Sequence, residues 1–231
     1  YIAERTRFDK EANIDSKRYH LTLLAKNNQG YKNIMKLVSM SFIDGYYYKP
    51  RMDEELLRQY SAGIICLSGC PAGELAHAIR ANDGAKQKSI IEKYQSIFGK
   101  ENFFLELMGH AEVEGYETLK AGVKKLSKEF DIPIVATWDS HYLHEDDKEA
   151  HNTLLNINTQ GSGMKMGGDY SFIDPTKALG FFHDTPEAVE QTNRVAEMVS
   201  IDIELGKWVF PKFELEPGET PESQLKKKVY A

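Results

Sequence analysis

Side chains able to bind a metal ion follow three short apolar stretches of the sequence. Asp139 and His141 come directly after IPIVAT (132–137), and Cys70 and His110 each follow another such stretch across one glycine. Residues two apart in an extended segment point to the same side, so Asp139 and His141 can share one metal centre or a metal pair. Carboxylate, imidazole and thiolate are the ligands of zinc sites, and mixed oxygen–nitrogen sites also take manganese. The spacing indicates a divalent-metal site at the ends of these stretches.

Each of these side chains also has a purely structural interpretation. Asp139 and His141 can be a helix cap and a surface histidine ahead of the acidic helix start at 145–147. Cys70 can be a small buried apolar group, and His110 a solvated turn residue. His20, taken alone, is typical of a structural histidine. Residue types and spacing leave the metal site and these alternatives open.

Other chemistry has weaker support in the sequence. The chain has no Gly-x-Ser-x-Gly sequence, which disfavours a serine nucleophile on a strand-to-helix turn. Glu106 is the single acid within FFLELM (103–108), and its side chain points either inward or toward the covering helices. Because an inward carboxylate could belong to a catalytic pair, the sequence does not exclude a glycosidase that uses two carboxylates. The glycine-rich stretch 160–169 lacks the Gly-Lys-Ser/Thr of a phosphate-binding loop and is expected to be a surface loop. The remaining histidines are expected at the surface or in packing: His77, His144, His183 and His151.

Alternating apolar stretches and helical patterns must position these side chains. The short apolar stretches predict strands over 19–25, 63–68, 103–108 and 132–137. Helical spacing of apolar residues predicts helices over 29–42, 85–98, 114–130, 145–158 and 186–199, and Pro71 can open one more. Such alternation predicts a parallel sheet covered by helices, with the functional groups at the carboxyl ends of its strands.

Composition narrows the class of protein. The 231 residues suffice for one large domain or two small ones. A hydrophobic fraction of 41% excludes a disordered chain, and no apolar run approaches the roughly 18 residues of a membrane span. The net charge of -6 argues against a dedicated nucleic-acid clamp. The sequence has only two cysteines, Cys66 and Cys70, and so small a number favours a reduced, cytoplasmic setting. Cys66 lies inside an apolar stretch and is expected in the core.

Four segments stand in an order that resembles one known family. They are HLTLLAKNNQGYKNIMKLVS (20–39), GIICLSGCPAGEL (63–75), FFLELMGHA (103–111) and IPIVATWDSHYLHEDDKEAH (132–151). Together they resemble the PHP (polymerase and histidinol phosphatase) domain of bacterial DNA polymerase III alpha subunits. The ending WVFPKFELEPGETPESQLKKKVY (208–230) is similar to the segment in which those subunits pass from the PHP domain toward the polymerase palm. The resemblance covers nearly the whole chain.

The resemblance implies an α/β fold and a ligand set. It implies an incomplete distorted (β/α)7 barrel of the PHP type over residues 1–207, followed by a linker over 208–231. The implied metal ligands are His20, Cys70, Asp139 and His141, with His110 beside the site as a supporting group. Zinc or manganese would occupy this site, and the parent polymerase would use magnesium at a palm site outside this chain.

The sequence departs from the family pattern at two places. The family begins with a His-x-His motif and further His, Asp and Glu ligands, which this sequence does not contain, so a barrel without its first strands and an incomplete three-metal cluster are expected. Trp138 stands where the family usually has Asn, which alters the hydrogen bonding expected beside Asp139.

The implied function is that of a fragment of a DNA-directed DNA polymerase of DNA replication. The fragment lacks the polymerase catalytic residues, and by itself it is expected to be inactive as a polymerase and as a phosphoesterase. Its PHP module resembles a metal-dependent phosphoesterase with either a 3′–5′ exonuclease or a structural role. The implied partners are DNA, a proofreading exonuclease and other replisome subunits, without a membrane. The alternatives are a stand-alone phosphoesterase similar to histidinol phosphatase and a non-catalytic docking module, and only the last predicts that the four ligands fail to converge.

Overall fold

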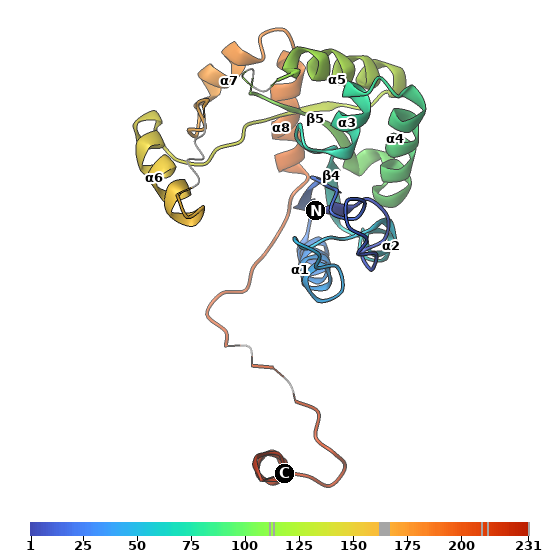
Figure 1. Cartoon of the computed structure of the whole chain (residues 1–231), viewed down its shortest axis with the longest axis vertical. Coiled ribbons are helices and arrows are strands. Elements are labelled where there is room, and N and C mark those ends of the chain that lie inside the picture. Colours follow the sequence, from blue (N-terminus) through green and yellow to red (C-terminus); the bar gives the residue numbers. More distant parts are fainter. Residues whose placement is uncertain (111, 113, 162–166, 209, 212, 231) are drawn as a thin grey trace.

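Four strands form the central sheet of the computed structural model (Figure 1). The structure describes residues 1–230 except 111, 113, 162–166, 209 and 212. The strands lie side by side in the order β3 (Thr22–Ala25), β4 (Ile64–Leu67), β5 (Phe103–Met108) and β6 (Ile134–Thr137). All four were predicted from the apolar stretches. A separate pair joins β1 (Ile2–Ala3) to β2 (Arg18–Tyr19) in antiparallel fashion, and the sequence patterns did not predict it.

The direction of β3 corrects the prediction of a wholly parallel sheet. β4, β5 and β6 run parallel, whereas β3 pairs antiparallel with β4, Ala25 opposite Ile64. The chain passes from β3 through α1 (Asn28–Ile43) and α2 (Glu54–Gln59) and enters β4 at the end where β3 stops. Both strand directions bury alternate side chains in the same way, so an apolar stretch does not disclose its direction.

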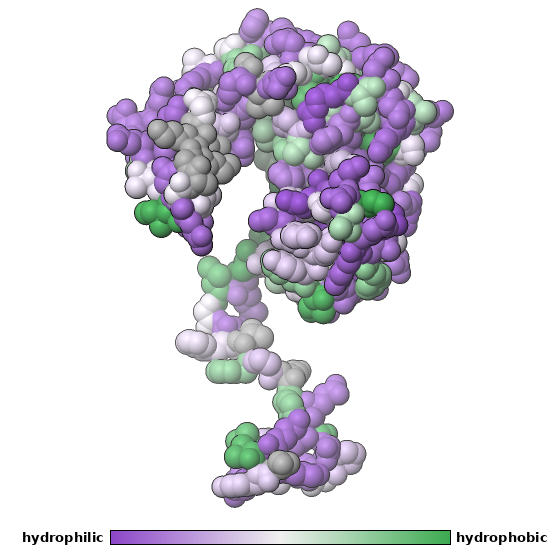
Figure 2. Space-filling view, in the orientation of Figure 1, coloured by the Kyte–Doolittle hydropathy of each residue, from purple (hydrophilic) through white to green (hydrophobic). Residues whose placement is uncertain are grey.

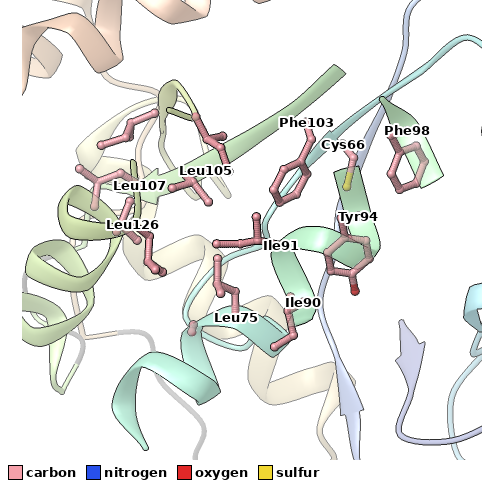
Figure 3. Packing of buried hydrophobic residues seen from close by; sticks show 14 of the residues in the cluster. Cys66, Leu75, Ile90, Ile91, Tyr94, Phe98, Phe103, Leu105, Leu107 and Leu126 are labelled. Atoms are coloured by element: carbon pink, nitrogen blue, oxygen red, sulfur yellow. The ribbon is translucent and has the colours of Figure 1, made fainter. Parts of the chain in front are cut away.

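Alternate residues of the strands build two separate apolar layers. Phe103, Leu105 and Leu107 face the main cluster, which Figure 3 shows packed against Leu75 and Ile91 of the covering helices. The neighbouring residues on the other face form a smaller cluster, made of Ile65, Leu67, Phe104, Val135 and Val195. Cys66 is fully buried in the main cluster, as predicted. This period of two is the expected burial pattern of a sheet covered on both faces.

Helices cover both faces of the sheet (Figure 1). The main cluster takes its helical residues chiefly from α3 (Glu74–Arg80), α4 (Gly84–Phe98) and α5 (Tyr116–Phe130). On the other face α8 (Pro186–Glu197) packs against β6 and supplies Val195. The Asp83 side chain accepts a hydrogen bond from the Lys86 N–H at the start of α4, which explains why Asp-Gly separates two helices there. These helices confirm the predicted helical patterns to within a few residues.

Three short helices were not predicted. α2, α7 (Pro175–Phe181) and α9 (Pro221–Val229) begin after Asp53, Asp174 and Thr220, whose side chains accept hydrogen bonds from the first-turn N–H groups. The predicted helix over 145–158 is a 3-10 turn (Glu145–Asp147) followed by α6 (Lys148–Asn158). Of the predicted loop 160–169, residues 162–166 lie outside the described residues.

The segment predicted as a linker, 208–231, contains α9. It leaves the domain as an extended tail (Figure 1), along which Figure 2 shows several hydrophobic patches. The side chains of Trp208 and Phe210 in this segment are 88% and 76% exposed. No helix within the described ranges is long and apolar enough to cross a membrane. The predicted α/β class is confirmed, and a barrel remains a prediction because the described strands form a four-stranded and a two-stranded sheet.

Candidate metal centre

His20 and Cys70 form a close pair at one end of the sheet. His20 lies just before β3, and its backbone N–H donates to the Ala72 carbonyl at 3.1 Å. Cys70 lies in the turn that joins β4 to α3, and its Sγ is 3.1 Å from Nδ1 of His20. Partial burial, followed by nearby positive charge, lowers the pKa of His20, so its ring is neutral at neutral pH. Burial raises the pKa of the Cys70 thiol.

Gly69 makes this pair possible. Its φ of +91° lies in the region that disfavours residues with a side chain, and a Cβ here would lie 2.5 Å from the His20 carbonyl oxygen. With glycine at position 69, the turn approaches the backbone of His20 more closely than it could with any residue that has a Cβ there.

Asp139 and His141 form a second pair in the segment after β6. Nδ1 of His141 lies 2.8 Å from the backbone oxygen of Asp139 and 3.8 Å from its carboxylate. A ring nitrogen that donates to a carbonyl leaves the other nitrogen, Nε2, with the lone pair that a metal needs. Both side chains are partly exposed, His141 at 36% and Asp139 at 46%. The pair is thus open to an incoming ligand.

The four predicted ligands line a single cleft. Its walls are Tyr1, His20, Leu21, Thr22, Cys70, Met108, Asp139 and His141. They meet there as two pairs: among the described residues, no three His, Cys, Asp or Glu side chains are grouped closely enough to hold a metal ion. The donor set of two imidazoles, a thiolate and a carboxylate suits zinc, and its nitrogen and oxygen atoms also suit manganese. The residues present therefore fit a divalent metal in chemical type.

His110 supports Asp139 from behind. It is 2% exposed, which makes the solvated-turn interpretation wrong. Its Nε2 lies 3.2 Å from the Asp139 N–H and accepts that hydrogen bond, so the ring proton resides on Nδ1, 3.0 Å from Oε1 of Glu112. The rings of Trp138 and Tyr170 lie at 5.0 and 4.4 Å from the imidazole. His110 fixes the Asp139 backbone without lining the cleft.

Trp138, at the position where the family resemblance led us to expect Asn, makes no side-chain hydrogen bond with the described residues. Its indole Nε1 is buried and has no hydrogen-bond partner among the described residues. The ring packs instead against His110 and Phe181. Polar support of Asp139 therefore comes from the imidazole of His110.

Two features of the site escaped the sequence analysis: part of the cleft lining and the hydrogen bonding of Glu106. Tyr1, Thr22 and Met108 line the cleft, although nothing in their spacing indicated this. Glu106 turns out to be 6% exposed and hydrogen-bonded to threonines of two neighbouring strands. A single acid within an otherwise apolar stretch was the only signal for it.

The first part of the chain matches the model of a known protein family. Residues 2–110 match the family model described as the PHP domain. Residues 2–110 therefore belong to the PHP family. This PHP match contains His20, Cys70 and His110, whereas Asp139 and His141 lie beyond the matched residues.

Curated relatives extend the similarity past the PHP match. The DNA polymerase III subunit alpha of Borreliella burgdorferi is 36% identical over 204 residues, covering 85% of this chain and 18% of the relative. The proteins of the same name from Treponema pallidum and Aquifex aeolicus are 35% and 30% identical over 88% and 100% of this chain, and 18% and 21% of the relatives. The chain thus spans about a fifth of the length of these relatives. The resemblance seen in the sequence is confirmed, and the chain is homologous to part of DNA polymerase III alpha subunits.

Proposed function

We propose that the chain is a segment of a replicative DNA polymerase III alpha subunit whose PHP domain binds zinc or manganese and acts on phosphoesters. The observation that supports this best is that His20, Cys70, Asp139 and His141 line one cleft, although they come from three separate parts of the chain. Homology with subunits named DNA polymerase III alpha supplies the biological setting.

The chain's own side chains prepare the cleft for a metal. A bound divalent ion would lower the pKa of a water molecule and neutralise charge on a phosphate group. His141 offers Nε2 because its Nδ1 is engaged by the Asp139 backbone oxygen. His110 holds the Asp139 backbone N–H, and Cys70 would bind as the thiolate after losing its proton. Thr22 and Leu21 add a polar and an apolar wall beside His20.

The proposal extends to the rest of the polypeptide. Residues 1–207 would form the PHP domain and 208–231 the connection toward a palm, where magnesium would serve nucleotide addition to DNA. A proofreading exonuclease and other replisome subunits would be partners in the cytoplasm, where thiols such as Cys66 and Cys70 stay reduced. The cleft itself would be a 3′–5′ exonuclease site, since its metal would meet a phosphodiester.

A second candidate function is a non-catalytic support or docking module. It is favoured by the arrangement of the four ligands in pairs, with no group of three among the described residues. Zinc held by such pairs would stabilise the domain without processing a substrate.

Metal binding and nuclease activity separate these candidates. The 231-residue chain, stripped with a chelator, would be titrated with zinc and with manganese by calorimetry, beside a double variant Asp139→Asn/His141→Ala and the control His183→Ala. His183 is an exposed histidine outside the cleft, so its variant should bind as the parent does. Stoichiometric binding that only the double variant loses is the expected result. An unaltered affinity in the double variant, or no binding by the parent chain, would refute the metal centre.

A 3′-labelled single-stranded DNA oligonucleotide tests the chemistry. Metal-dependent release of the terminal nucleotide, lost in the double variant, supports the exonuclease role. Stoichiometric metal without release supports the structural role.

A further inference from the structure

Glu106 is a buried carboxylate at the meeting point of three strands. It belongs to β5, whose other residues are apolar, and it is 6% exposed. Its Oε2 accepts from the Thr22 hydroxyl of β3 and its Oε1 from the Thr137 hydroxyl of β6, both at 2.9 Å. It also accepts from the backbone N–H of Gly69, after β4. One carboxylate therefore joins β3 and β6, which are not neighbours in the sheet, and the β4–α3 turn.

Each of these donors adjoins a predicted metal ligand. Thr22 follows His20 by two residues, Gly69 directly precedes Cys70, and Thr137 precedes Asp139 by two residues. A shift of any donor therefore moves the ligand next to it. The carboxylate touches none of the ligands itself, since its hydrogen bonds go to Thr22, Thr137 and Gly69.

The face of the sheet explains how the donors converge. Residues two apart on a strand lie on the same face of the sheet. Phe104, Val135 and Leu24 belong to the smaller apolar cluster on one face. Two positions nearer the cleft on the same strands and the same face lie Glu106, Thr137 and Thr22. The apolar layer thus ends in a polar layer, and the ligands follow it. The Ser68 hydroxyl accepts from the Glu106 N–H at 2.9 Å, which ties the backbone of β5 to the same turn.

A role in the fold alone would not require a carboxylate here. Burial opposes the ionised form and raises the pKa of Glu106, while the three donors act in the opposite direction. No ion pair of Glu106 occurs among the described residues. An apolar side chain of similar size would avoid this desolvation, so the carboxylate is costly unless the three-way connection itself matters.

We propose that Glu106 is the positioning residue of the cleft: through Thr22, Gly69 and Thr137 it sets where His20, Cys70 and Asp139 stand relative to one another. The inference rests on the proposed metal centre and deepens it. Glu106 is not a ligand and takes no part in bond making.

Three variants test this role in the 231-residue chain. Glu106→Ala removes all three connections, and Glu106→Gln keeps the shape and part of the hydrogen bonding. Leu105→Ala is the matched control, because Leu105 is the fully buried neighbour that faces the opposite, main cluster. It removes core packing without touching the donors.

Two readouts distinguish the positioning role from a loss of stability. The first is zinc affinity, expected to fall about 10- to 100-fold in Glu106→Ala, as for groups that orient metal ligands, less in Glu106→Gln, and by less than about twofold in Leu105→Ala. The second uses no metal: iodoacetamide alkylation of Cys70 should be faster in Glu106→Ala, because the turn after β4 loses its anchor. Cys66, fully buried, reports unfolding in the same sample and should stay unmodified.

The outcomes separate this inference from the metal proposal. If the parent chain binds no zinc, the metal centre fails, and the Cys70 alkylation rate still decides whether Glu106 anchors the turn. If zinc affinity and Cys70 reactivity in Glu106→Ala match those of Leu105→Ala, the positioning role is refuted. Should Glu106→Ala not fold, Thr137→Val replaces it, removing one donor with little change of shape, and an unchanged zinc affinity and Cys70 rate in that variant refute the role.

Discussion

Arg51 offers the sharpest test of how the irregular segment between β1 and β2 is fixed to the rest of the domain. Its side chain is fully buried, and its guanidinium donates to four backbone carbonyls, those of Gly45 at 3.0 Å, Asp15 at 2.8 Å, Arg7 at 3.1 Å and Asp9 at 2.9 Å. Three of these carbonyls belong to the irregular segment between β1 and β2. Arg51 therefore fastens that segment to the loop after α1.

The expected cost of Arg51→Ala follows from this arrangement. Hydrogen bonds from a charged group contribute about 1.5–3 kcal/mol each, and desolvation of the guanidinium offsets several kcal/mol of their sum. The variant leaves the four carbonyls without their donor and opens a cavity. We expect the free energy of unfolding to fall by about 3–5 kcal/mol, a large part of the roughly 5–15 kcal/mol typical of a domain. Arg51→Lys, with three donors in place of five, should cost about half as much.

Urea unfolding followed by circular dichroism measures these differences. Arg58→Ala is the matched control, because Arg58 is half exposed and pairs with Glu54 on the helix surface, an interaction of about 0.3–0.5 kcal/mol. Trypsin should also cut at Lys10 and Lys17 much faster in Arg51→Ala than in the parent chain. A loss below about 1 kcal/mol, equal to the control, would show that the four carbonyls are satisfied by water and that the reasoning is wrong.

Three further predictions concern the cleft and its surroundings. Gly69→Ala should lose about 1–3 kcal/mol of stability and weaken zinc binding in calorimetry, because the new Cβ meets the His20 carbonyl at a positive φ; unaltered binding would contradict this. His110→Ala should lower zinc affinity about 10- to 100-fold by releasing the Asp139 backbone, while His110→Gln, which keeps an acceptor, should recover part of it; equal loss in both would count against the hydrogen bond. Two lysines of α5 hold the pKa of Asp184 at about 2, below its unfolded value, so this carboxylate stabilises the fold fully above about pH 4, and the contribution is lost as the pH falls from 4 through about 2. Since its side chain is 37% exposed, Asp184→Asn should cost no more than about 1 kcal/mol at pH 7 and only a small fraction of that at pH 2 in thermal unfolding, and a pH-independent cost would refute the ion pair.

Periodic burial made most of the sheet and its long helices predictable. β5 and β6 are apolar except for Glu106 and Thr137, because both of their faces are covered, and α4 and α5 repeat apolar residues every three or four positions. The short helices α2 and α7 were missed because six or seven residues contain too few periods. Their signal was the capping residue: Asp53 precedes two glutamates, and Asp174 precedes a proline.

The candidate site was predictable only in part, because it combines residues from segments that lie far apart in the sequence. Asp139 and His141 follow a strand end, where spacing alone points to chemistry. His20 precedes its strand, and only the family resemblance indicated it; the antiparallel direction of β3 explains why its start meets the ends of the other strands. Glu106 depends on donors from two strands far apart in the sequence, and no local pattern encodes such a meeting.

The tail after α8 turns α9 into a tethered helix. Asn28 fixes the beginning of the tail through two hydrogen bonds with the backbone of Asp202, and the described residues from 201 to 220 form no helix or strand. A random coil of roughly 20 residues, the length of this segment, would have an end-to-end distance of about 25 Å, which would hold α9 at millimolar effective concentration near the domain. A surface contact of α9 too weak to form between separate molecules can therefore be populated within one chain. The lysines at the end of α9, Lys226, Lys227 and Lys228, would make such a contact weaken as salt is added.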